Sequence, residues 1–75
     1  MTYDAELDAK GLLCPLPVLK ARKRLQALQS GQVLRMEADD PAAIVDVPHF
    51  CTEAGHELMD MADSDAGQVY FIRKA

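Results

Sequence analysis

The sequence predicts an α/β (α+β) fold: a two-layer sandwich in which two helices pack on one face of a four-stranded mixed sheet. Four short segments alternate apolar and polar residues, and two others repeat apolar residues every three or four positions. These segments follow one another in the order βαβαββ. Right-handed connections between the strands would place both helices on the same face of the sheet.

The composition indicates a single small globular domain, which we expect to span residues 1–75. Apolar residues make up 49% of the chain and aromatic residues only 5%, so the expected core is aliphatic. The N-terminal segment has no apolar signal core, and no run is long enough to span a membrane. The two cysteines, Cys14 and Cys51, are too few for a secreted disulfide scaffold, so we expect a reduced, cytoplasmic protein.

The first strand and first helix are expected on either side of residues 10–13. Residues 5–9 alternate and predict the strand, which ends before Gly11. The helix should begin at Pro15 with Cys14 as its N-cap, and end near Gly31. Its expected apolar face consists of four residues: Val18, Ala21, Leu25 and Leu28.

Residues 32–38 predict the second strand, with Leu34, Met36 and Ala38 on one side. Residues 39–55 then predict the second helix, with Asp40 as N-cap, Pro41 at the first helical position and Gly55 as its end. Pro48 lies inside this pattern and should kink or restart the helix. Its expected apolar face consists of Ile44, Val47, Cys51 and Ala54.

Two further strands, residues 56–63 and 68–74, should pair through a hairpin turn at residues 64–67. We expect the methionines at positions 36, 59 and 61 to fill the core.

The position of Cys14 is typical of a reactive cysteine. A sulfur at a helix N-terminus lies near unpaired N–H groups and the positive end of the helix dipole, which predicts a lowered thiol pKa. Pro15 and Pro17 fix the backbone at the first and third helical positions. The alternative is a small buried apolar residue, but Cys14 lies off the apolar stripe of its helix.

The stretch LDAKGLLCPLPVLKARKRL, followed by ADDPAAIVDVPHFC, resembles the TusA/SirA family of small sulfur-carrier proteins. The shared marks are a CPxP motif, Gly11-x-x-Cys14-Pro15-x-Pro17, and a DDPA motif beginning at Asp39, Asp40 and Pro41. The similarity runs from about Leu7 to Lys74. Many members of the tRNA-thiolating type carry Arg directly before the cysteine, where this chain has Leu13.

This resemblance implies that Cys14 carries sulfur as a persulfide. The donor would be a cysteine desulfurase or rhodanese, and the acceptor a DsrE/TusD-type or other protein. The implied uses are tRNA thiolation, cofactor biosynthesis and sulfur oxidation. The chain offers no Ser/His/Asp set, glycine-rich phosphate loop or metal-ligand cluster, so we expect no cofactor and no metal. We therefore expect a sulfurtransferase that acts as a protein substrate, and whether it counts as an enzyme stays open.

The other candidate residues have plain structural explanations beside the functional ones. Four bases follow the cysteine, and they either dock a partner or form a solvated helix face: Lys20, Arg22, Lys23 and Arg24. Asp39 and Asp40 are better explained by turn geometry and helix capping than as an acid/base pair. Cys51 is expected in the core, and His49 and His56 have no assigned role.

Two alternative functions remain. A regulatory or nucleic-acid-binding module would use the basic first helix, with Cys14 structural, but the net charge of −4 argues against direct nucleic-acid binding. A thiol redox protein would be expected to carry a CxxC motif, which this chain lacks. A carrier that presents one thiol can act as a monomer, which is the state we expect.

Overall fold

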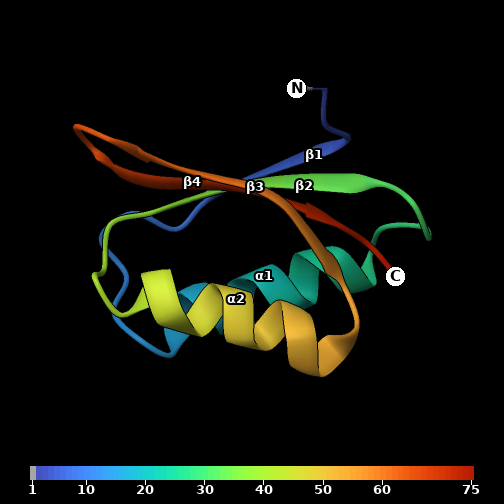
Figure 1. The fold of residues 1–75 in the computed structure, drawn as a ribbon, viewed down its shortest axis with the longest axis horizontal. Helices are drawn as coiled ribbons and strands as arrows, with labels where there is room; N and C mark the ends of the chain where they lie inside the picture. The colour runs from blue at the N-terminus through green and yellow to red at the C-terminus, as the bar shows by residue number, and fades with distance from the viewer. Residues whose placement is uncertain (1) are drawn as a thin grey trace.

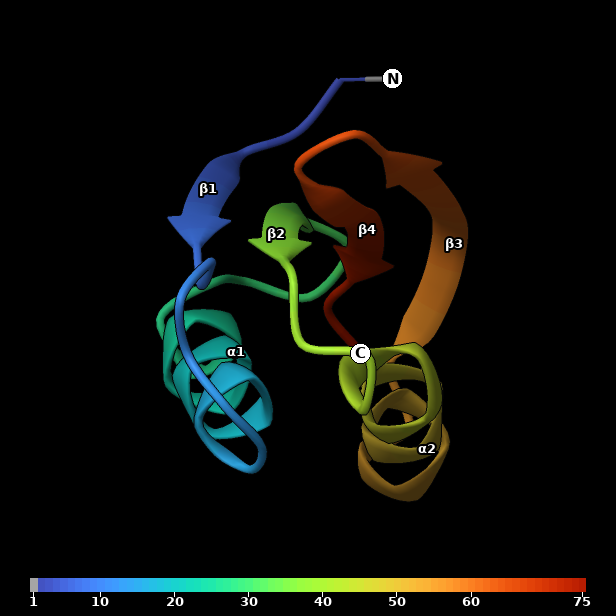
Figure 2. The same ribbon diagram turned by 90° about the vertical axis from the view of Figure 1, so that its left-hand side faces the viewer.

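All six predicted elements form, in the predicted order. The computed structural model describes residues 2–75. The elements are β1 (Ala5–Asp8), α1 (Leu16–Gln26), β2 (Val33–Ala38), α2 (Ala43–Ala54), β3 (Glu57–Ser64) and β4 (Gly67–Arg73). The strand order is β1-β2-β4-β3, with β1 and β2 parallel and the other two pairings antiparallel. Both helices lie on one face of this mixed sheet (Figures 1 and 2), so the predicted fold is confirmed.

The core lies between the sheet and the two helices. The alternation predicted for β2 is confirmed, because Leu34, Met36 and Ala38 are fully buried on the helix side. The core is not purely aliphatic, however, since Phe50 and Tyr70 are also buried in it. The Tyr70 hydroxyl donates a hydrogen bond to Gln68 Oε1 at 3.1 Å, which offsets the cost of burying this polar group.

The first helix is shorter than predicted at both ends. It begins at Leu16, with Pro15 at the N-cap position, so Cys14 lies one residue before the cap. It ends at Gln26, because the N–H groups of Ala27 and Leu28 bond to carbonyls three residues back and tighten the last turn. Gly31, at φ +90°, belongs to the following turn and does not end the helix.

The second helix also starts later than predicted. Asp40 and Pro41 are not its N-cap and first residue, because they form a turn before Ala43, the first helical residue. The helix then continues through Pro48 to Ala54 without restarting. Its predicted end is confirmed, since Gly55 adopts the left-handed conformation at φ +80°.

The buried stripe of α2 differs from the predicted one. Ile44 is 41% exposed and Ala54 is exposed, whereas Ala43 and Phe50 face the core beside Val47 and Cys51. The buried set is spaced 0, 4, 7 and 8 residues from the helix start, which is a regular helical stripe. Ile44 follows Ala43 by one residue and therefore points about 100° away from that stripe.

The β3–β4 hairpin has a tighter turn than predicted, with only residues 65–66 between the strands. Gly67, at φ +136°, closely approaches the end of β2, and a Cβ there would lie 2.2 Å from the Ala38 carbonyl oxygen. Met61 is 37% exposed and Met59 is half-buried, so the prediction that both fill the core is wrong. They lie on β3, an edge strand that the helices cover incompletely. Within residues 2–75, no helix combines the length and the apolar character needed to cross a membrane.

Candidate functional site

The loop that carries Cys14 is fastened to the loop after β2. The Gly11 N–H donates to Asp39 Oδ1 at 2.9 Å, and the Cys14 N–H donates to Asp40 Oδ2 at 2.6 Å. The second oxygen of Asp40 accepts from the Ala42 N–H at 3.1 Å, so one carboxylate joins the cysteine loop to the start of α2. Because β1 and β2 are parallel neighbours, the loops at their carboxyl ends meet at the same edge.

We call the hydrogen bonds from Gly11 and Cys14 to Asp39 and Asp40 the clamp. Sequence reasoning missed the clamp, because it assigned Asp39 and Asp40 to turn geometry and helix capping. The capping interpretation is wrong, because no side chain of the described residues caps α2; the hydrogen bond from the Ala42 N–H to Asp40 belongs to the turn before the helix. The available signal was the position of both aspartates directly after the strand that pairs with β1. Gly11 suits its place in the clamp, because its φ of +84° lies in the left-handed region that favours glycine.

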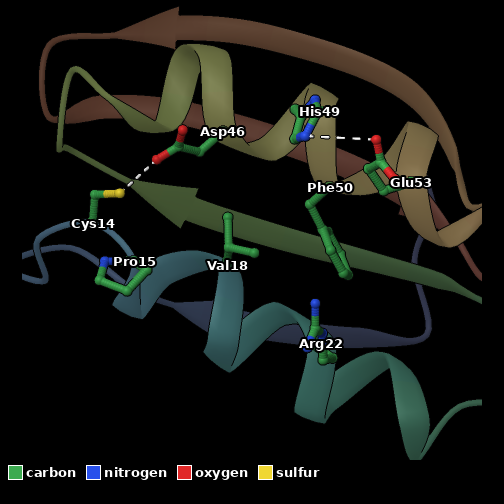
Figure 3. Close-up of a pocket in the computed structure, with 8 residues that line it drawn as sticks. All are labelled: Cys14, Pro15, Val18, Arg22, Asp46, His49, Phe50 and Glu53. Atoms are coloured by element: carbon green, nitrogen blue, oxygen red, sulfur yellow. Dashed lines mark hydrogen bonds and ion pairs between the residues drawn. The ribbon is translucent and has the colours of Figure 1, made fainter.

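The Cys14 thiol is exposed and points toward α2, as Figure 3 shows. Its Sγ donates a hydrogen bond to Asp46 Oδ2 at 2.7 Å. The sulfur is therefore not the N-cap of α1, and its hydrogen-bond partner is a carboxylate of the opposite helix. The Cys14–Pro15 peptide bond is cis, and Pro17 is buried at the second position of α1.

The expectation of a lowered pKa for Cys14 is wrong. The hydrogen bond to Asp46 raises the pKa of the thiol, with smaller contributions from the loss of some hydrating water and from the negative charges of Asp46 and Asp40. A thiolate beside these carboxylates would lose the hydrogen bond and be repelled by them. The raised pKa favours the protonated thiol over the thiolate in the resting protein.

A groove of about 500 Å³ runs between α1 and α2 and has Cys14 at one end (Figure 3). Val18 and Arg22 point into it from α1, and Phe50 points toward them from α2. The Arg22 guanidinium lies 5.7 Å from the centre of the Phe50 ring, within the range of a cation–π contact. The wall contributed by α2 also carries Asp46, His49 and Glu53.

The four bases of α1 do not act as one group. Arg22 lines the groove, whereas Arg24 Nη1 donates to the Glu6 carbonyl oxygen at 2.7 Å and ties α1 to β1. Lys20 and Lys23 are exposed, three residues apart on one side of the helix. Docking by these residues stays a proposal.

The remaining candidates are placed as follows. Cys51 lies in the core, as predicted, and burial raises the pKa of its thiol to about 11. His49 Nε2 lies 3.7 Å from Glu53 Oε1 on the exposed side of α2. His56 Nδ1 accepts a hydrogen bond from the Ala75 N–H at 3.0 Å. Leu13, directly before the cysteine, is 70% exposed and adds an apolar surface beside the thiol.

Comparisons with known proteins show which family the chain resembles over nearly its whole length. The family model of the sulfurtransferase TusA matches residues 5–74. The chain is 46% identical over 72 residues to the sulfur carrier protein TusA of Allochromatium vinosum, a match covering 96% of this chain and 93% of that protein. It is 42% identical over 74 residues to the protein of the same name from Pseudomonas entomophila, covering 99% of this chain and 92% of that one.

Among solved structures, a SirA-like protein from Desulfitobacterium hafniense superposes with a TM-score of 0.80. It is 25% identical, and the match covers 96% of this chain and 97% of that structure. The family model spans the residues of both the CPxP and the DDPA motifs, and the structural match covers nearly the whole chain. The chain belongs to the family of the sulfurtransferase TusA.

Proposed function

We propose that this protein is a sulfur carrier that holds one transferable sulfur atom as a persulfide on Cys14. The observation that carries the proposal is the exposed Cys14 thiol, which lies at the end of the α1–α2 groove and within the span that the family model matches. The relatives at 42–46% identity that bear the name sulfur carrier protein support the same role.

The chemistry requires only a thiol that another protein's sulfur can reach. In persulfide transfer, the sulfur of one cysteine attacks a sulfur that is already bonded to a second sulfur, and the second cysteine leaves as a thiol. Cys14 offers the required access, and the clamp from Asp39 and Asp40 holds its backbone in place. Cys51 is 2% exposed, so it does not offer the same access.

The partners we propose are proteins that donate and accept sulfur. A cysteine desulfurase or a rhodanese would load Cys14, and a DsrE/TusD-type protein or another acceptor would unload it for tRNA thiolation, cofactor biosynthesis or sulfur oxidation. The contacts with these partners would be made by exposed residues around the thiol: Leu13, directly before Cys14, and Lys20 and Lys23 on α1. We further propose that the protein works as a monomer in the cytoplasm, where Cys14 stays reduced.

Nothing in the arrangement of bases favours the alternative of a nucleic-acid-binding module. Such a module would use a continuous basic face, but Arg24 is bonded to β1 and Arg22 lies over Phe50 in the groove. The net charge of −4 adds to this argument.

A transfer experiment tests the proposal. The protein would be loaded by a cysteine desulfurase with radiolabelled cysteine, separated from the desulfurase and mixed with a DsrE-type acceptor. We expect the label to move to the acceptor, to be released by reductant, and to be absent when Cys14→Ser replaces the wild type. Cys51→Ala is the matched control and should relay the label normally. Label that stays on the protein in the presence of acceptors, or that also loads Cys14→Ser, would contradict the carrier role.

A further inference from the structure

We propose that Asp46 is the general base of the sulfur-accepting step: its carboxylate takes the proton from the Cys14 thiol as the sulfur attacks the donor's persulfide. This inference rests on the proposed sulfur-carrier function and assigns a role to a residue outside the CPxP and DDPA motifs.

The contact between the two side chains is direct and is made by the fold. Asp46 Oδ2 accepts a hydrogen bond from Cys14 Sγ at 2.7 Å, although the residues are 32 positions apart in the chain. Asp46 lies in the first turn of α2, where the helix dipole favours a negative charge. Among the residues that the structure describes, no ion pair engages this carboxylate, so no cation competes with the Cys14 thiol for it.

The surroundings of the thiol make such a base useful. Asp40 approaches it from the loop before α2, and Arg22, His49 and Glu53 line the groove beyond it on α1 and α2. The carboxylates of Asp46 and Asp40 raise the pKa of Cys14, so a free thiolate is scarce at neutral pH. A base within hydrogen-bond reach removes this barrier, because the proton can leave as the new sulfur–sulfur bond forms.

The step balances without an outside oxidant or reductant. Cys14 Sγ attacks the outer sulfur of the donor cysteine's persulfide, R–S–SH, where R is the rest of the donor. The bond between Sγ and the outer sulfur forms, and the donor's sulfur–sulfur bond breaks with its electron pair moving to the donor cysteine. The proton held by Asp46 then passes to that leaving sulfur. The products are a Cys14 persulfide and a donor thiol, with no net oxidation.

If Asp46 is the general base, its removal should have opposite effects on two reactions of the Cys14 thiol: alkylation and sulfur loading. Iodoacetamide reacts with the thiolate and releases iodide, which needs no proton, so Asp46 only slows that reaction by keeping the thiol protonated. The donor persulfide releases a cysteine sulfur, which leaves more readily when it receives a proton. Removing the base should therefore speed alkylation and slow sulfur loading.

The test uses the full chain with Asp46→Asn, which preserves the shape of the side chain but not its basicity. Asp65, in the β3–β4 turn, neither lines the groove nor contributes to the raised pKa of Cys14, so Asp65→Asn removes the same charge and serves as the matched control. Two rates would be measured from pH 6 to pH 9: alkylation of Cys14 by iodoacetamide, and single-turnover loading from a cysteine desulfurase that carries a persulfide.

We expect Asp46→Asn to be alkylated several-fold faster than wild type at pH 7 and to be loaded on the order of 100-fold more slowly at pH 6.5. Its loading rate should also rise steeply with pH, whereas the wild-type rate is nearly flat below the pKa of the thiol. Asp46→Glu, which restores a carboxylate, should recover part of the loading rate. Asp65→Asn should match wild type in both reactions.

Other outcomes overturn the assignment in distinguishable ways. If both rates rise in Asp46→Asn, the carboxylate only suppresses the thiolate and is not a base. If neither rate changes, the hydrogen bond has no role in reactivity. If wild type itself takes up no sulfur while Cys14 is still alkylated, the proposed carrier function fails, and the role of Asp46 fails with it.

Discussion

Replacing Asp40 tests whether the clamp between the two loops holds the cysteine in place. Its carboxylate accepts hydrogen bonds from the Cys14 N–H at 2.6 Å and the Ala42 N–H at 3.1 Å. Asp40→Ala removes both bonds, whereas Asp40→Asn keeps one carbonyl oxygen and therefore one bond. Asp39→Ala removes only the neighbouring bond to Gly11 and provides a matched comparison.

The expected loss of stability follows from counting these bonds. Hydrogen bonds to charged groups contribute about 1.5–3 kcal/mol, and solvent at this exposed edge reduces that to about 1 kcal/mol each. Asp40→Ala should therefore lower the free energy of unfolding by about 2 kcal/mol, and the other two variants by about 1 kcal/mol. For a domain of this size, a loss of 1 kcal/mol lowers Tm by roughly 4–8 °C.

Urea unfolding followed by circular dichroism measures these differences, and the rate of Cys14 alkylation provides a second measurement. Asp40→Ala should also be alkylated faster, because the Asp40 charge contributes to the raised pKa of the thiol. An Asp40→Ala variant within about 0.5 kcal/mol of wild type, the range of an ordinary surface substitution, would refute the clamp.

Three further predictions concern the rest of the molecule. Gly67 has a φ of +136°, and Gly67→Ala would place a methyl group 2.2 Å from a backbone oxygen. This variant should lower the free energy of urea unfolding by about 2–4 kcal/mol, and a loss below about 1 kcal/mol would contradict the close approach. Iodoacetamide at pH 8 should modify Cys14 but not Cys51, whose pKa burial raises to about 11; equal labelling of the folded protein, measured by intact mass, would show that Cys51 is accessible. The hydrogen bond from Lys10 holds the pKa of Glu37 below its ordinary value of 4.5. The ionised Glu37 side chain therefore contributes its full share of the free energy of unfolding above pH 4.5, and this contribution is lost as the pH falls. Between pH 5 and pH 3, the free energy of unfolding should therefore fall less in Glu37→Gln than in wild type. Parallel plots of this free energy against pH for the two proteins would contradict the prediction.

The fold could be predicted because each element carries its own local signal. In β2 the alternation of apolar and polar residues predicts which side of the strand is buried, and in α2 Gly55 predicts where the helix ends. The ends of α1 and the start of α2 were misplaced, because tight turns before and after a helix use the same proline, glycine and aspartate residues as caps. In α2 the sequence predicts Ile44 and Ala54 in the buried stripe, where the structure has Ala43 and Phe50, because two apolar series one residue apart run along this short helix.

The candidate site could be predicted only in part. Cys14 was recognisable from its position before a helix and from the CPxP motif. Its pKa was predicted in the wrong direction, because the local rule for helix N-termini ignores Asp46, which reaches the thiol only once α1 and α2 pack side by side. The clamp from Asp39 likewise depends on β1 and β2 being parallel neighbours, which is a property of the folded sheet.

The most direct test of the carrier role is to locate the sulfur atom that a donor adds. The wild type, Cys14→Ser and Cys51→Ala would each be incubated with a cysteine desulfurase and cysteine, alkylated, and analysed by intact-mass and fragment mass spectrometry. We predict one added sulfur on the fragment that contains Cys14 in the wild type and Cys51→Ala, removed by reductant, and none in Cys14→Ser. Sulfur on any other residue, or none on the wild type with either a desulfurase or a rhodanese as donor, would contradict the account.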